Sequence, residues 1–135
     1  MAALHRRDRA HALAAAVIGR LGRDLLVPDP VAVEVDHLLR SRGETVAARR
    51  FLAALAVGEH AVAFLSPGLL RRAQEIDEQY ADLDLGLVDA SVMAIAERRD
   101  SPILTFDFQH FRATRPARGY WRLVVDEAGY ADAIS

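Results

Sequence analysis

The sequence "PILTFDFQHF", residues 102–111, has the pattern of a short buried strand that stops at an acidic residue. The apolar run ends at Phe106, and Asp107 follows it directly. A short, nearly continuous apolar run is typical of a strand that is covered on both faces. His110 and Phe111 come next, in a segment that we predict to be a loop, with Phe111 packed onto the core. The position of Asp107 therefore raises the question of what an aspartate does at the end of a strand.

Strands and helices alternate on both sides of this stretch. Further short apolar runs predict strands at 25–27, 61–65 and 121–125, while helical spacing and helix start and stop residues predict helices at 8–22, 30–40, 44–58, 67–80 and 87–99. Asp29 and Ser66 are expected to cap the helices that follow them. This alternation predicts an α/β fold, in which a mostly parallel sheet is covered by helices in a three-layer arrangement. A length of 135 residues predicts one domain, 1–135.

Composition narrows the class of protein. Since 52% of the residues are hydrophobic, the chain has enough apolar surface for a packed core. The absence of cysteine excludes disulfides and thiolate metal sites, and it suits a cytoplasmic protein. The longest apolar run, 12–18, is too short to cross a membrane, which takes about 20 residues. The formal net charge is -2, so any binding of nucleic acid must rely on a local group of basic residues and not on the charge of the whole chain.

Three acidic residues are placed where an α/β fold usually forms its site, at the carboxyl ends of parallel strands. Asp107 follows the strand at 102–106, and Glu34 and Asp89 lie in the first turns of two helices. Any one of them alone could simply favour a helix start, an effect of about 0.3–1 kcal/mol. Asp89 is harder to explain in this way, because apolar residues surround it and an unpaired buried carboxylate is costly.

Three carboxylates that meet at one edge would repel one another unless a cation lies between them. Oxygen ligands without cysteine favour a hard ion, Mg2+ or Mn2+. Such an ion can activate a water and neutralise the charge that builds up on a phosphate. The three acids therefore point to hydrolysis of phosphodiester bonds.

Four stretches of the sequence carry a resemblance to a known family: "RRDRAHA" at 6–12, "VPDPVAVEVDHLL" at 27–39, "YADLDLGLVDAS" at 80–91 and "ILTFDFQHF" at 103–111. Together they resemble the PIN-domain ribonucleases, of the kind found as VapC-type toxins in bacterial toxin–antitoxin pairs. The resemblance implies that Glu34, Asp89 and Asp107 are catalytic and metal-binding, and that Thr105 supports the site through its hydroxyl. It also implies a metal-dependent endoribonuclease with a PIN-like fold, a homodimer and a cognate antitoxin.

The resemblance has one departure, at the start of the chain. The family normally opens with a strand that carries a first catalytic aspartate, and "MAALHRRDRAHA" resembles the segment after that strand. Asp8 belongs to this later segment and does not replace the missing acid. Two explanations compete: either Met1 is an internal start, or the chain is an inactive relative that retains dimer or antitoxin binding. A partner or a second copy could also add a strand to the open sheet.

Arginines after the last acid are candidates for contact with RNA. The candidates for binding phosphates are Arg112, Arg115 and Arg118, although a solvated loop with scattered arginines is an alternative reading. Tyr120 and Trp121 are the nearest aromatic residues in sequence that could stack single-stranded bases, and Trp121 is expected in the core. A phosphate-accepting receiver domain fits less well. Such a domain should have a lysine near the end of its sequence, and this chain contains no lysine.

Overall fold

The computed structural model describes residues 25–100, 102–103 and 108–123. Contacts between residues divide the chain into two compact units, one that spans Arg23–Asp100 and one to which residues 102–103 and 108–123 belong. The helix predicted at 8–22 lies outside the described residues. Division into one domain stays a prediction.

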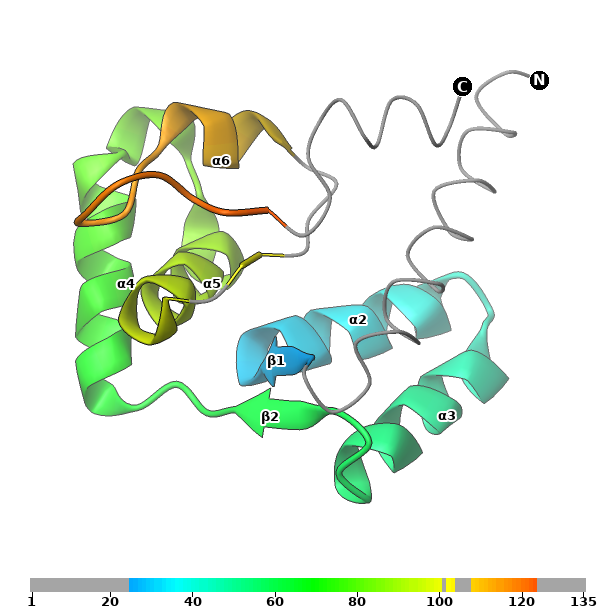
Figure 1. Cartoon of the computed structure of the whole chain (residues 1–135). Coiled ribbons are helices and arrows are strands. Elements are labelled where there is room, and N and C mark those ends of the chain that lie inside the picture. Colours follow the sequence, from blue (N-terminus) through cyan, green and yellow to red (C-terminus); the bar gives the residue numbers. More distant parts are fainter. Residues whose placement is uncertain (1–24, 101, 104–107, 124–135) are drawn as a thin grey trace. The chain divides into compact units, whose positions relative to one another are not determined.

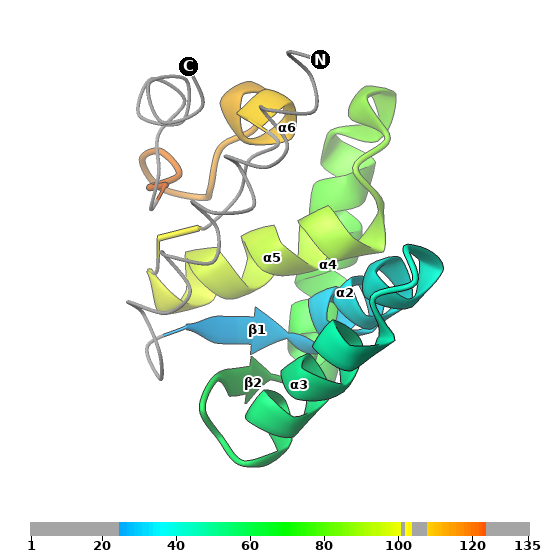
Figure 2. The ribbon, with the colours of Figure 1, turned by 90° about the vertical axis from the view of Figure 1, so that its right-hand side faces the viewer.

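A short parallel sheet lies in the first unit. Strand β1 (Leu26–Pro28) pairs with β2 (Ala61–Ala63), and Val27 stands opposite Val62. Helices α2 (Asp29–Ser41) and α3 (Thr45–Ala56) connect the two strands, as a parallel pair requires a crossover. Figure 2 shows both arrows pointing the same way, with α5 running along β1. The predicted α/β fold, with helices around a parallel sheet, is confirmed.

Strand β2 is shorter than the 61–65 predicted from its apolar run. It ends at Ala63, and the next residue, Phe64, is 74% exposed. The backbone N–H of Leu65 donates to a side chain, Asp29, instead of to a neighbouring strand. The sheet therefore stops two residues earlier than hydrophobicity alone indicates.

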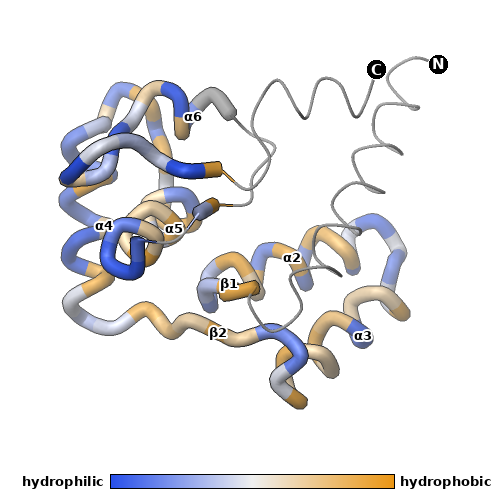
Figure 3. The backbone as a smooth tube through the Cα atoms, in the orientation of Figure 1, coloured by the Kyte–Doolittle hydropathy of each residue, from blue (hydrophilic) through white to orange (hydrophobic). Residues whose placement is uncertain are grey.

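Helices α4 (Pro67–Gln79) and α5 (Gly86–Arg99) pack against each other, joined through the short helix η2 (Ala81–Leu83) (Figure 1). The predicted cap of α4 is confirmed: Ser66 Oγ accepts from the N–H of Leu69 at 3.3 Å, and Pro67 occupies the first helical position. Hydrophilic and hydrophobic residues alternate along α4 in Figure 3, as expected of a helix with one buried stripe. Helix α5 is the most buried element of this unit, with six buried residues: Ala90, Ser91, Met93, Ala94, Ile95 and Ala96.

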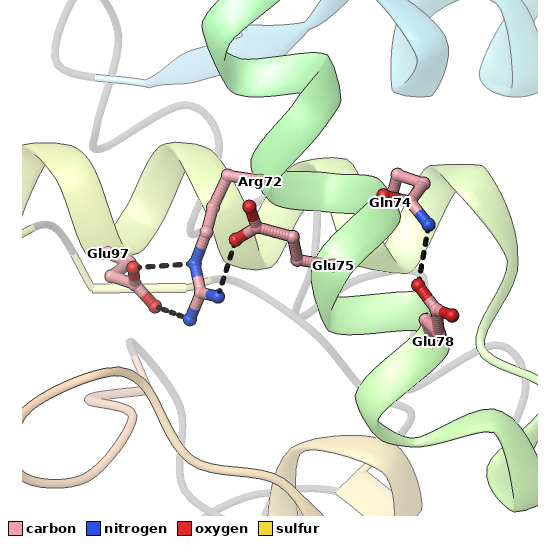
Figure 4. Close-up of polar contacts among 5 residues, drawn as sticks. All are labelled: Arg72, Gln74, Glu75, Glu78 and Glu97. Atoms are coloured by element: carbon pink, nitrogen blue, oxygen red, sulfur yellow. Dashed lines mark hydrogen bonds and ion pairs between the residues drawn. The ribbon is translucent and has the colours of Figure 1, made fainter.

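A partly buried ion pair joins α4 to α5 (Figure 4). Arg72 donates from Nε to Glu97 Oε1 at 2.9 Å and from Nη2 to Oε2 at 3.0 Å. Its Nη1 also donates to Glu75 at 3.3 Å. The hydrogen bond to Glu97 holds the pKa of Arg72 above its ordinary value. A bidentate ion pair of this kind fixes the rotation of one helix against the other, because both nitrogen donors of the arginine must face both carboxylate oxygens.

Replacement of Arg72 by Met is expected to lower the free energy of unfolding by about 1–2 kcal/mol, because it removes the charged hydrogen bonds while keeping much of the side-chain stem. Urea unfolding followed by circular dichroism measures the change. Gln74→Ala is the matched control on the same helix. It breaks only the exposed bond from Gln74 to Glu78, at 2.8 Å, and is expected to cost less than about 0.5 kcal/mol. Equal effects of the two variants would contradict a special role for the pair with Glu97.

The second unit contains helix α6 (Phe108–Ala113) and a parallel bridge between Ile103 and Leu123. The N–H of Ile103 donates to the carbonyl of Arg122 at 2.7 Å. The strands predicted at 102–106 and 121–125 are therefore neighbours at this point, and their other residues from 104 and from 124 onward lie outside the described residues. The loop predicted at His110 and Phe111 is wrong, since both belong to α6. None of the helices in the described parts is long and apolar enough to cross a membrane.

Candidate functional site

The carboxyl edge of the β1–β2 pair is held together by Asp29. The expected capping role of this residue is wrong: Pro28 is at the N-cap position, no side chain caps the helix, and Asp29 is the first residue of α2. Asp29 Oδ1 instead accepts from the N–H of Leu65 at 3.0 Å. The residue after β1 is thus bonded to the chain just beyond β2. The sequence did not predict this role, because an aspartate before a proline has the same local pattern whether it caps a helix or accepts a hydrogen bond from a distant part of the chain.

Glu34 lies in the second turn of α2, as predicted, and its side chain is exposed. Its neighbour on the helix, Asp36, is paired with Arg40 through Nε at 3.0 and 3.1 Å. Within the described residues Glu34 has no such partner. Its carboxylate is therefore accessible to a ligand from solvent.

Asp89 lies in the first turn of α5 and is partly buried. The two residues that follow it, Ala90 and Ser91, are buried, and the Ser91 hydroxyl has no hydrogen-bond partner in the described parts of the chain. The first turn of a helix favours a negative charge through the backbone dipole. The apolar setting predicted for Asp89 is found on one side only, since Ala90 is buried while Leu87 is 54% exposed.

Two of the three predicted acids lie on helices that touch. Helix α5 contacts both α2 and β1 within the first unit. Figure 2 shows β1 pointing toward the side on which α5 begins, which is also the side where α2 follows β1. Glu34 and Asp89 thus belong to two helices that begin on the side toward which β1 points, and their convergence on one site stays a prediction.

Asp107 and Thr105 lie outside the described residues, so the third acid and its supporting hydroxyl stay predictions. Among residues 25–100, 102–103 and 108–123, no group of three or more His, Asp or Glu is placed to hold a metal ion. The donors that are described, Glu34 and Asp89, are carboxylate oxygens. Such donors fit Mg2+ or Mn2+, because Mg2+ often keeps several waters and takes only one or two carboxylates from the protein.

Arginines and aromatic residues gather in the second unit. Arg112 and Arg115 are exposed, as a role in substrate binding requires. Phe111 is 7% exposed and its ring meets Trp121 edge-on, with the ring centroids 6.4 Å apart. The predicted packing of Phe111 is confirmed, while Trp121 is half-buried. The sequence did not predict that Arg115 lies over the Tyr120 ring, with Cζ 4.8 Å from the ring centroid.

Comparisons with known proteins confirm the resemblance to PIN-domain ribonucleases that was noted in the sequence. Residues 1–116 match the PIN domain family. The chain is also 36% identical over 98 residues to Ribonuclease VapC26 of Mycobacterium tuberculosis, which corresponds to 71% of this chain and 73% of that protein.

Proposed function

Because this chain belongs to the PIN-domain family, we propose that it is the ribonuclease toxin of a toxin–antitoxin pair and that it hydrolyses RNA with a carboxylate-bound Mg2+ or Mn2+. The observation that carries the proposal is the 36% identity to a VapC ribonuclease over most of both chains. The acids at the carboxyl edge support it, because Asp89 is partly buried at a helix start and Glu34 is exposed on a helix that touches α5.

In this proposal Glu34, Asp89 and Asp107 hold the ion, and Thr105 orients the site through its hydroxyl. When bound, the ion supplies an activated water and stabilises negative charge on the phosphate. Asp89 lies in the first turn of α5, where the helix dipole favours a negatively charged group. The Asp29 to Leu65 bond closes the strand edge beside the site. Arg112 and Arg115 bind phosphates of the RNA.

The proposal includes a homodimer, a cognate antitoxin and a place in the cytoplasm. Apolar residues that are exposed on α2 and α3 support binding of a protein partner, since a partner would remove their side chains from water. They are Val33, Leu38, Val46 and Leu52. The absence of cysteine supports a reducing compartment.

The test is cleavage of a mixed single-stranded RNA pool by the purified chain, with Mg2+, with Mn2+ and with EDTA. Cutting is expected with either ion and is expected to stop with EDTA, because the ion supplies the activated water. A version that is extended upstream is assayed beside it. If neither version cuts with either ion, the chain is a binding module of the family instead of a nuclease.

A further inference from the structure

The described segment 108–123 carries a concentrated positive charge. It holds four arginines and no Asp or Glu, which gives a formal charge of +4 in a chain whose total is -2. All four arginines, Arg112, Arg115, Arg118 and Arg122, are exposed. Figure 3 shows mostly hydrophilic colours along the stretch after α6. A local cationic surface of this kind attracts a polyanion even when the whole protein is slightly acidic.

A set of buried contacts gives this segment a fixed shape. Thr114 is 3% exposed, and its Oγ1 donates to the carbonyl of His110 at 2.8 Å and accepts from Trp121 Nε1 at 3.0 Å. The chain between Thr114 and Trp121 is therefore closed at its base. Gly119, with φ of +75°, reverses its direction near the tip, where most side chains would be strained.

This closed turn brings Arg115 and Tyr120 together. The guanidinium carbon of Arg115 lies 4.8 Å from the centroid of the Tyr120 ring, within the range of a cation–π contact. Tyr120 is nevertheless 73% exposed. A guanidinium covers only one face of a ring, so the opposite face of Tyr120 is open to solvent.

We propose that the Arg115–Tyr120 pair is a stacking platform for an unpaired base of the RNA substrate, with Arg112 and Arg118 bound to the neighbouring phosphates. Bases of single strands stack on aromatic rings and on guanidinium planes, and nearby cations track the backbone. A base inside a duplex does not offer its face, so the platform selects single-stranded RNA. An acidic protein segment would use the charges but not the open ring, and the exposed ring therefore favours nucleic acid.

The inference rests on the proposed ribonuclease function, and binding measured without cleavage separates the two. A short 5′-labelled oligouridine is titrated with the full chain in EDTA, and fluorescence anisotropy is recorded. Tyr120→Ala is expected to weaken binding about 5- to 150-fold, the range for loss of one base stack. Tyr120→Phe keeps the ring and is expected to bind within about twofold of the parent. A duplex of the same length should bind more weakly than the single strand.

Matched variants elsewhere control for loss of any exposed ring or charge. Phe64→Ala removes a ring that is 74% exposed in the other unit, and its RNA binding should equal that of the parent. Arg112→Ala should lower the slope of log K against log salt concentration by about 0.7, the value for one phosphate contact on a single strand. Arg50→Ala removes one exposed arginine from α3 and should leave the slope unchanged.

Tyr120→Ala with the parent's affinity would overturn the platform, and so would equal binding of duplex and single strand. If Tyr120→Ala weakens binding of an acidic peptide but not of RNA, the surface belongs to a protein partner, which also overturns the proposal. If the chain does not cleave RNA but binds it in a way that depends on Tyr120, the platform proposal is supported and the proposed nuclease activity is contradicted. If Tyr120→Ala changes neither the RNA cleavage nor the RNA binding of an active chain, the nuclease proposal stands and the platform proposal is overturned.

Discussion

Asp89→Asn is expected to reduce metal-dependent RNA cleavage by about 100-fold or more. Asparagine has nearly the same shape as aspartate but lacks the charge that would hold Mg2+ or Mn2+. Because asparagine preserves the shape of this partly buried side chain in the first turn of α5, the substitution should leave the fold intact. Initial cleavage rates at saturating RNA, with urea unfolding of the same samples, measure both effects. A higher Mn2+ concentration should restore part of the rate if the lost group is a metal ligand.

The control for Asp89→Asn is Glu78→Gln, which also removes one carboxylate charge. Glu78 is exposed on α4 and accepts a hydrogen bond from Gln74 at 2.8 Å. Its replacement should change the cleavage rate by less than about twofold, since an exposed charge outside the site acts only through screened, long-range fields. A full rate for Asp89→Asn would remove Asp89 from the proposed metal site, whatever the result for Glu78→Gln.

Met93→Ala is expected to lower the free energy of unfolding by about 2–5 kcal/mol, because it removes buried apolar atoms and leaves a cavity. Met93 has 0% exposure and is the largest fully buried side chain among the described residues. It lies on α5, the helix that packs against α4, α2 and β1. A whole domain is stable by only about 5–15 kcal/mol, so this single change is expected to remove a large share of the total.

Two variants on the same helix make the measurement specific. Met93→Leu preserves most of the volume and is expected to cost less than about 1.5 kcal/mol. Leu87→Ala removes a side chain that is 54% exposed and should cost clearly less than Met93→Ala. Urea unfolding of the three variants gives the comparison. A Met93→Ala variant as stable as Leu87→Ala would mean that α5 is not the centre of the core.

Most helices of the first unit were predictable because their signals are local. Ser66 and Pro67 mark the start of α4 within two residues, and the buried positions Ala73 and Ile76 follow at helical spacing. The apolar run around Asp89 likewise predicted the buried helix α5. These features depend on neighbours a few residues away, which a sequence displays directly.

Other features depend on partners that are distant in sequence. Asp29 has the local signature of a cap, yet its hydrogen bond goes to Leu65, which no local pattern indicates. Helix α6 has only six residues, too few for a clear helical period, and it was predicted as a loop. At the candidate site, the sequence predicted that acidic residues lie in the first turns of two helices. The pairing of Arg115 with Tyr120 was not predicted, because it depends on how the turn between them closes.

The bond from Asp29 to Leu65 joins positions that are 36 apart in sequence, and it closes next to the parallel pair β1–β2. Before these strands can meet, the chain must give up the freedom of the whole segment between them, which includes α2 and α3. Helices and the contact between consecutive helices form from nearby residues and therefore form quickly. The α2–α3 hairpin should thus be present early during folding, and the strand edge that carries the candidate site should be among the last parts to assemble.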